Sequence, residues 1–398
     1  MRRWFILATG LIAQATTSSF LYGLPFLIPA LQTGHGLSLT SASVLISAPL
    51  LGLLLALIAW GAAADRFGER SVMAAGLALT GVLLLVSLTL PGFVLFGLGL
   101  LLAGACSASV NAASGRVVLG WFSARERGLA MGIRQTAQPV GVGIAAATLP
   151  ALADHHGFAT ALVLPAVLCL ASAVLVWFVV VDPPRPEPTV SSAASPYTGP
   201  TATTLIRLHT ASSMLVVPQF VSATFAVTYL VSARGWHPVA AGQLVAVVQV
   251  GGAAGRILAG VWSDRAGSRT GPMRLIALGA LATIVLWGVG DALDLPWLAI
   301  GALVAAMVVS VTDNGLGFTA TAELAGPFWA GRALGVQNTG QNITAMAAAP
   351  LFSALITAFG YPLALGVAAL FPAAGAALTP VAGESAARVG AVEVEVRP

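Results

Sequence analysis

The stretches "GAAADRFGER", residues 61–70, and "GVWSDRAGSR", residues 260–269, share one pattern of glycines and charges. Each reads Gly, three residues, Asp-Arg, one residue, Gly, one residue and Arg. The two aspartates, Asp65 and Asp264, stand 199 positions apart in a chain of 398 residues. A charged pattern that occurs twice, half a chain apart, indicates an internal duplication.

The composition around these stretches is that of a membrane protein. Hydrophobic residues make up 58% of the chain and charged residues 8%, against roughly 25% charged residues in soluble domains. So few charges could not form a water-facing surface, and the mean hydropathy is +0.92. All 18 basic residues are arginines, and they cluster at the ends of apolar runs, so the net charge of +4 does not indicate nucleic-acid binding.

Apolar runs of about 20 residues, the length that crosses a bilayer, recur along the whole chain. They predict twelve membrane-spanning helices, over residues 4–31, 41–64, 71–90, 93–120, 128–153, 158–181, 206–233, 239–262, 273–292, 296–322, 329–358 and 361–381. Six prolines with Ser and Thr make residues 182–204 a linker between two halves, 1–181 and 205–381. Residues 382–398 form a polar tail.

The distribution of arginines orients these spans. With the N-terminus in the cytoplasm, fourteen arginines fall in inner loops and ends, and only Arg234 falls in an outer loop. This positive-inside bias predicts that both termini are cytoplasmic, in the inner membrane of a bacterium.

The two halves repeat beyond the opening motif. "GLAMGIRQTAQ" at 128–138 corresponds to "GRALGVQNTGQ" at 331–341, and Asn111 corresponds to Asn314. Gln14 likewise corresponds to Gln219. The unit that is duplicated is therefore six helices long.

With these features the chain resembles the major facilitator superfamily, whose signature is the Gly-x-x-x-Asp-Arg-x-Gly-x-Arg loop after the second helix. The resemblance implies an all-α membrane protein of two pseudo-symmetric six-helix bundles around a central cavity, working by alternating access. It also implies a gating motif, in which Asp65 lies at the N-terminus of a neighbouring helix while Arg66 and Arg70 bond carbonyls and acids. The alternative is that these arginines only anchor the topology. The motif residues are Gly61, Asp65, Arg66, Gly68, Arg70, Gly260, Asp264, Arg265 and Arg269. Glu69 and Ala63 depart from the usual residues of this signature.

Two arginines inside the spans suggest the solute. A charge at bilayer depth is costly, so each needs a partner or a function. The Gly-Arg at 255–256 is similar to that of the monocarboxylate and oxalate–formate transporters, in which this arginine binds the substrate carboxylate. Arg256 is therefore expected to bind an anionic solute, such as a carboxylate or a cyanate- or nitrate-like ion, or else to pair with Asp313. Arg134 is a second anion contact or part of the inner gate.

The other intramembrane charges have less specific interpretations. Asp313 either takes up a proton during transport or forms a static ion pair. Arg116 is interpreted mainly as an interfacial anchor or gate, and Glu323 as a partner for Arg332 or Arg265. Uncharged polar residues of the spans complete the expected solute site: Gln14, Tyr22, Asn111, Gln138, Gln219, Tyr229, Asn314 and Gln341.

Other classes of function find little support. The chain lacks the phosphate-binding Gly-x-x-x-x-Gly-Lys-Ser/Thr loop of ATP-driven pumps, and its histidines and two cysteines have no metal-site or catalytic spacing. We expect no enzyme activity, no cofactor, no metal and no nucleic acid, and a monomer whose partners are the solute, the bilayer and, where Asp313 titrates, protons. Two alternatives remain: a proton-coupled exporter of lipophilic drugs, and a non-transporting receptor or scaffold.

Overall fold

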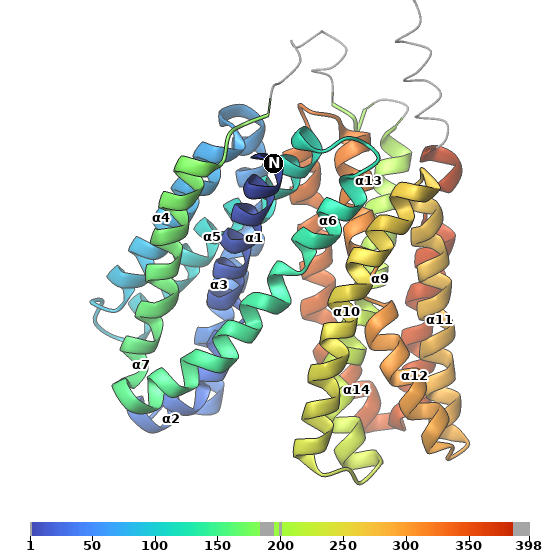
Figure 1. Ribbon diagram of the computed structural model, residues 1–398. Helices are drawn as coiled ribbons and strands as arrows, with labels where there is room; N and C mark the ends of the chain where they lie inside the picture. Colours follow the sequence, from blue (N-terminus) through green and yellow to red (C-terminus); the bar gives the residue numbers. More distant parts are fainter. Residues whose placement is uncertain (1, 184–194, 199–200, 385–398) are drawn as a thin grey trace, which may run out of the picture. The chain divides into compact units, whose positions relative to one another are not determined.

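The computed structural model describes residues 2–183, 195–198 and 201–384, and these are folded almost entirely into helices (Figure 1). In the first half, α1 (Arg2–Leu21), the short η1 (Leu24–Leu27) and α2 (Ile28–His35) are followed by five further helices. These are α3 (Leu39–Phe67), α4 (Glu69–Ser87), α5 (Phe93–Trp121), α6 (Arg127–Gln135) and α7 (Ala137–Val179).

The second half repeats this order of long helices. It consists of α9 (Ala202–Thr228), the π-helical turn η2 (Tyr229–Ala233), α10 (Pro238–Ala266), α11 (Thr270–Ala292), α12 (Pro296–Val309), α13 (Asn314–Ala325) and α14 (Ala330–Leu378). Most of the predicted linker and tail, residues 184–194, 199–200 and 385–398, lies outside the described residues.

Ten helical segments of the described residues are long and apolar enough to cross a membrane. Two of them, Arg127–Val179 and Ala330–Glu384, are each long enough for two crossings. Gly157 and Gly360, with φ of 84° and 78°, interrupt these two segments, and only glycine enters this backbone region readily. The interruptions fall where the sequence separates spans 128–153 and 158–181, and 329–358 and 361–381, so the architecture is that of the predicted twelve-helix fold.

The chain forms two compact units, each with its own core. Unit 1 comprises Met1–Ser123, Ile133–Pro188 and Pro327–Thr339, and unit 2 comprises Ala124–Gly132, Thr189–Gly326 and Gly340–Pro398. Apolar clusters that include Phe20 and Met73 fill unit 1, and clusters that include Trp287 and Leu316 fill unit 2. Two helices are divided between the units. The first residues of α6 belong to unit 2 and its last residues to unit 1, whereas α14 starts in unit 1 and continues in unit 2.

Many large apolar side chains remain outside these cores. Phe178 is 78% exposed, Trp297 73% and Leu55 70%. A water-soluble protein rarely exposes so much contiguous apolar surface. In a multi-pass membrane protein these side chains face the hydrocarbon of the lipids.

Candidate functional site

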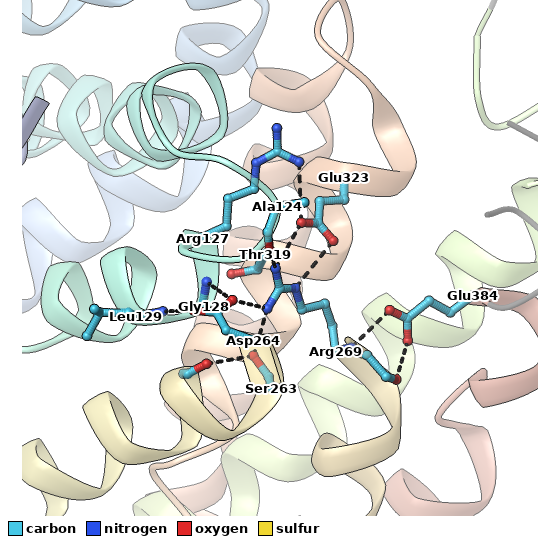
Figure 2. Close-up of polar contacts among 12 residues, drawn as sticks. Ala124, Arg127, Gly128, Leu129, Ser263, Asp264, Arg269, Thr319, Glu323 and Glu384 are labelled. Atoms are coloured by element: carbon cyan, nitrogen blue, oxygen red, sulfur yellow. Dashed lines mark hydrogen bonds and ion pairs between the residues drawn. The ribbon is translucent and has the colours of Figure 1, made fainter. Parts of the chain in front are cut away.

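Both motif aspartates cap a helix N-terminus in the same way. In unit 1 the carboxylate of Asp65 accepts the backbone N–H groups of Gly331 (2.9 Å) and Arg332 (3.0 Å) at the start of α14. In unit 2 the carboxylate of Asp264 accepts those of Gly128 (2.9 Å) and Leu129 (2.8 Å) at the start of α6 (Figure 2). An anion is favoured there by the unpaired N–H groups and the helix dipole.

Pairs of glycines allow these capping contacts. A Cβ atom added to Gly61 would lie 2.3 Å from the carbonyl oxygen of Gly331, and one added to Gly260 would lie 2.1 Å from that of Gly128. Two helices can approach this closely only when both lack a side chain at the crossing. The sequence shows Gly128 and Gly331 as repeated positions, but it does not reveal that they pack against the motif glycines.

The two capping sites obtain their positive charge from different places. In unit 2 the last motif residue, Arg269, is 2% exposed and ion-pairs with Asp264 (2.5 Å) and Glu323 (3.3 Å). It also donates to the carbonyl of Ala124, just before α6. Burial lowers the pKa of Arg269, but Glu323 and Asp264 together hold it above its ordinary value. Arg269 therefore stays charged. It links α10, α13 and the segment before α6 through its contacts with Asp264, Glu323 and the Ala124 carbonyl (Figure 2).

In unit 1 the positive charge comes from Arg116 on α5, not from the motif. Its guanidinium contacts Asp65 (2.8 Å) and Glu69 (2.9 Å), with side chains 4%, 2% and 0% exposed. It also donates to the carbonyl of Ala64. Of the two interpretations of Arg116, the interfacial anchor is wrong, because its side chain is buried between two acids. The gating role stays a prediction.

Within the part of the chain that the structure describes, the side chains of the unit 1 motif arginines do not make the acid contacts that the resemblance implies. Arg66 is exposed and stacks on Phe67, while the guanidinium of Arg70 lies over Trp177. Arg116 occupies the position beside Asp65 that Arg269 occupies beside Asp264. In unit 2, Glu323 is bound by Arg127 and Arg269, rather than by the Arg332 or Arg265 expected from the sequence.

A second pair of acids, to which the sequence patterns assign no role, caps the helices that follow the motifs. Asp182 accepts the backbone N–H of Arg70 (2.8 Å) at the start of α4. Glu384 accepts those of Arg269 and Thr270 (both 2.9 Å) at the start of α11. Glu384 is buried, so this residue of the predicted tail belongs to the fold. The signal in the sequence is an acid directly after the last apolar run of each half.

Within the spans of unit 1, five polar residues form one cluster that is largely buried. Gln14 on α1 donates to Asn111 on α5 (3.2 Å) and accepts from Ser114 (3.3 Å). Arg134, which is 3% exposed, donates to the hydroxyl of Ser114 (2.8 Å), the carbonyl of Asn111 (3.1 Å) and the amide of Gln135 (3.2 Å). These acceptors are uncharged, so they orient the guanidinium without cancelling its charge.

Unit 2 has a polar cluster around the break between α12 and α13. Arg256 on α10 is 7% exposed and donates to the carbonyl of Val311 (3.2 Å), which lies in the break. It also interacts electrostatically with Asp313, which is 2% exposed. Asn314 donates to Gln219 on α9 (3.0 Å), repeating the Asn111–Gln14 contact of unit 1.

The remaining predicted solute contacts are less closely grouped. Tyr22 and Gln138 are half-buried, and Gln341 is buried. Tyr229 lies at the end of α9 that is remote from the motif, where its hydroxyl donates to Asp291 (2.9 Å) and accepts from Arg234 (2.8 Å). Its ring packs edge-on against Trp287 and Tyr361. Tyr229 is thus bound within an aromatic and ionic cluster of unit 2.

Comparison with known proteins identifies the family to which this architecture corresponds. The model of the Major Facilitator Superfamily matches residues 10–350. A protein of Mycobacterium tuberculosis described as an uncharacterized MFS-type transporter is 43% identical over 382 residues, which cover 95% of this chain and 85% of that protein. A probable hexose phosphate transport protein of Chlamydia trachomatis is 25% identical over 58% of each chain.

Solved structures share the fold at low identity. The proton:xylose symporter XylE superposes with a TM-score of 0.76, at 15% identity and covering 94% of both chains. The human organic anion transporter MFSD10 superposes with a TM-score of 0.74, at 16% identity, covering 95% of this chain and 99% of that one.

Proposed function

Since the chain belongs to the major facilitator superfamily, and is therefore a secondary transporter and not an enzyme, we propose that its solute is a small anion. Arg134 in unit 1 and Arg256 in unit 2 are each a candidate contact for that anion. The observation that carries the proposal is the burial of two guanidinium groups, 7% and 3% exposed, at membrane depth. A charged side chain inside the membrane costs free energy, and such residues usually belong to a functional site.

The surroundings of Arg134 suit an anion site. Uncharged acceptors from Ser114, Asn111 and Gln135 fix the orientation of the guanidinium. A guanidinium held in this way presents a positive charge of fixed orientation, which suits a carboxylate or phosphate. Gln14 and Asn111, joined by their own hydrogen bond, supply further polar groups to the same cluster.

The surroundings of Arg256 suit a regulated contact. Its bond to the Val311 carbonyl anchors Nε, and Asp313 balances part of the charge. An anionic solute would compete with Asp313 for the guanidinium, which would favour uptake of a proton by the released carboxylate. This competition is a direct way to couple solute and proton movement.

One relative supports an anionic solute. The Chlamydia trachomatis protein is described as a probable hexose phosphate transport protein, and a hexose phosphate carries a dianionic group that guanidinium binds well. Organophosphates therefore join carboxylates and small inorganic anions as candidate solutes.

We propose that the capping contacts of Asp65 and Asp264 belong to one stage of an alternating-access cycle. Each aspartate holds the first turn of a helix whose remainder lies in the other compact unit. Release of Gly331 by Asp65, and of Gly128 by Asp264, would free these helices for the opposite stage.

The decisive experiment measures thermal stabilisation of the purified wild type, Arg134→Gln, Arg256→Gln and the control Arg207→Gln by a panel of solutes. The panel holds small carboxylates, sugar phosphates, inorganic anions and lipophilic cations. Arg207 is the matched control because it is exposed and donates to the carbonyls of Ala377 and Leu378.

We expect one class of anion to stabilise the wild type and Arg207→Gln but neither buried-arginine variant. That anion is then used in a flux assay in liposomes. Stabilisation by lipophilic cations alone, equal in all four proteins, would reject the anion and support drug export instead.

A further inference from the structure

The motif arginine of unit 1, Arg70, is directed away from the charge network around Asp65. Its backbone N–H is bound by Asp182, and its guanidinium carbon lies 4.3 Å from the centre of the Trp177 ring. Among the described residues, the structure records no hydrogen bond or ion pair from the Arg70 guanidinium, and Nε is buried without an acceptor. The Nη groups of Arg70 are not among the buried atoms, so among the described residues they are the part of this guanidinium that an acceptor from outside the protein can reach.

The environment of Arg70 is the border of the bilayer. Trp177 is 47% exposed and lies two residues before the end of α7, and Arg70 is the second residue of α4. Helix α4 packs against the part of α7 that follows Gly157 (Figure 1). Phe178 is 78% exposed beside Trp177. Tryptophan and arginine at the ends of membrane helices lie at the level of the lipid headgroups.

A second cation–aromatic pair lies at the same helix connection. Arg66, at the end of α3, stacks on Phe67, which is 62% exposed. The acids nearby are directed elsewhere: Glu69 points to the buried Arg116, and Asp182 accepts the Arg70 backbone N–H. The exposed surface at this connection therefore combines two guanidinium groups with three aromatic rings.

We infer that Arg70 and Trp177 form a binding site for the phosphate of an anionic phospholipid at the membrane border of unit 1. The Trp177 ring covers one face of the guanidinium, and the in-plane N–H groups of the two Nη atoms donate to a pair of phosphate oxygens. The acyl chains lie along the exposed apolar surface that includes Phe178. The described residues of unit 2 form no equivalent site at the motif, because Arg269 is buried between Asp264 and Glu323.

The test uses native mass spectrometry of the purified full-length protein, titrated with phosphatidylglycerol or with phosphatidylcholine of the same acyl chains. One arginine near a membrane surface contributes about 1 kcal/mol to binding of anionic lipid, a factor of about five in affinity. We expect Arg70→Gln and Trp177→Leu each to retain about fivefold less phosphatidylglycerol than the wild type. Trp177→Phe, which keeps an aromatic face, and the exposed-arginine control Arg207→Gln should retain nearly the wild-type amount.

Two results would overturn the inference. One is equal retention of phosphatidylglycerol by the wild type, Arg70→Gln and Trp177→Leu. The other is displacement of the lipid by millimolar inorganic phosphate alone, which would mark a site for free anions. If Arg70→Gln does not fold, Trp177→Leu against Trp177→Phe decides the question. The experiment is independent of the transported solute, so its failure leaves the proposed transport function untouched.

Discussion

The two copies of the motif have the same sequence pattern but obtain their counter-charges from different residues. In unit 2 the motif supplies both charges, Asp264 and Arg269, and α13 supplies the acid Glu323. In unit 1 the motif supplies two acids, Asp65 and Glu69, and α5 supplies the arginine, Arg116. The capping geometry is the same in both, so the cap is the common feature and the source of the counter-charge is not.

Removal of Arg116 is expected to have the largest effect. Arg116→Met leaves Asp65 and Glu69 buried without their guanidinium, and breaking a buried pair in this way costs about 3–5 kcal/mol. The equivalent position in unit 2, by the Asn111–Asn314 correspondence, is Thr319, whose hydroxyl only bonds Gly315 in its own helix. We expect Thr319→Val to cost about 1 kcal/mol or less. The measurement is the free energy of unfolding of both variants in detergent, and equal losses would contradict the asymmetry.

The last arginines of the two motifs offer the next comparison. Arg269→Gln removes the group that joins Asp264, Glu323 and the Ala124 carbonyl, and should lower the free energy of unfolding by about 2–4 kcal/mol. Arg70→Gln removes a half-exposed cation–π contact and should cost about 1 kcal/mol or less. Thermal denaturation of the two variants side by side measures the difference. A larger loss for Arg70→Gln would show that Arg70, and not Arg269, is the motif arginine on which the fold depends.

The glycine crossings test where the two units are alike. Gly128→Ala and Gly331→Ala each place a methyl group 2.4 Å from a backbone oxygen, of Gly260 and Gly61 respectively. Overpacking of this kind costs about 1–3 kcal/mol, and we expect similar losses in stability and in transport rate from both variants. Gly301→Ala, in the middle of α12 with nothing within 4 Å of the added Cβ, is the control and should not lose stability. If only one of the two variants lost stability and transport rate, the two glycine crossings would not have equivalent roles.

The acids that cap α4 and α11 should give the smallest effects. Asp182→Ala and Glu384→Ala each remove the side chain that accepts the first backbone N–H groups of a long helix, a loss of about 0.5–2 kcal/mol. Glu384 also accepts from Ser268 (2.9 Å), so its loss should be the greater of the two. Chemical denaturation of both variants measures which of them loses more free energy of unfolding. A chain that ends at Gly383 should be as unstable as Glu384→Ala, and full stability of that shorter chain would refute the cap.

The sequence was sufficient for those features that depend on local pattern. Apolar length predicted the spans, and Gly157 and Gly360 lie at two of the predicted boundaries. Repeated residues identified Gln14 with Gln219 and Asn111 with Asn314 as equivalent positions, and the structure shows that each half joins its own Gln and Asn by a hydrogen bond. A further signal was present in the departures from the repeat. The first half has an acid, Glu69, and a base, Arg116, at positions where the second half has the uncharged residues Ser268 and Thr319. Two opposite charges that are gained together in one half indicate an ion pair.

By itself the sequence determined that this is a membrane protein of twelve spans, duplicated around two copies of one motif, because hydropathy and repetition are properties of the chain alone. Only the tertiary structure decided that Arg116 neutralises Asp65, that Arg70 turns to Trp177, and that Glu384 caps α11. Asp65 and Arg116 are 51 positions apart on different helices. Whether they meet depends on how α3 and α5 are rotated and packed, and no spacing along the chain encodes that rotation.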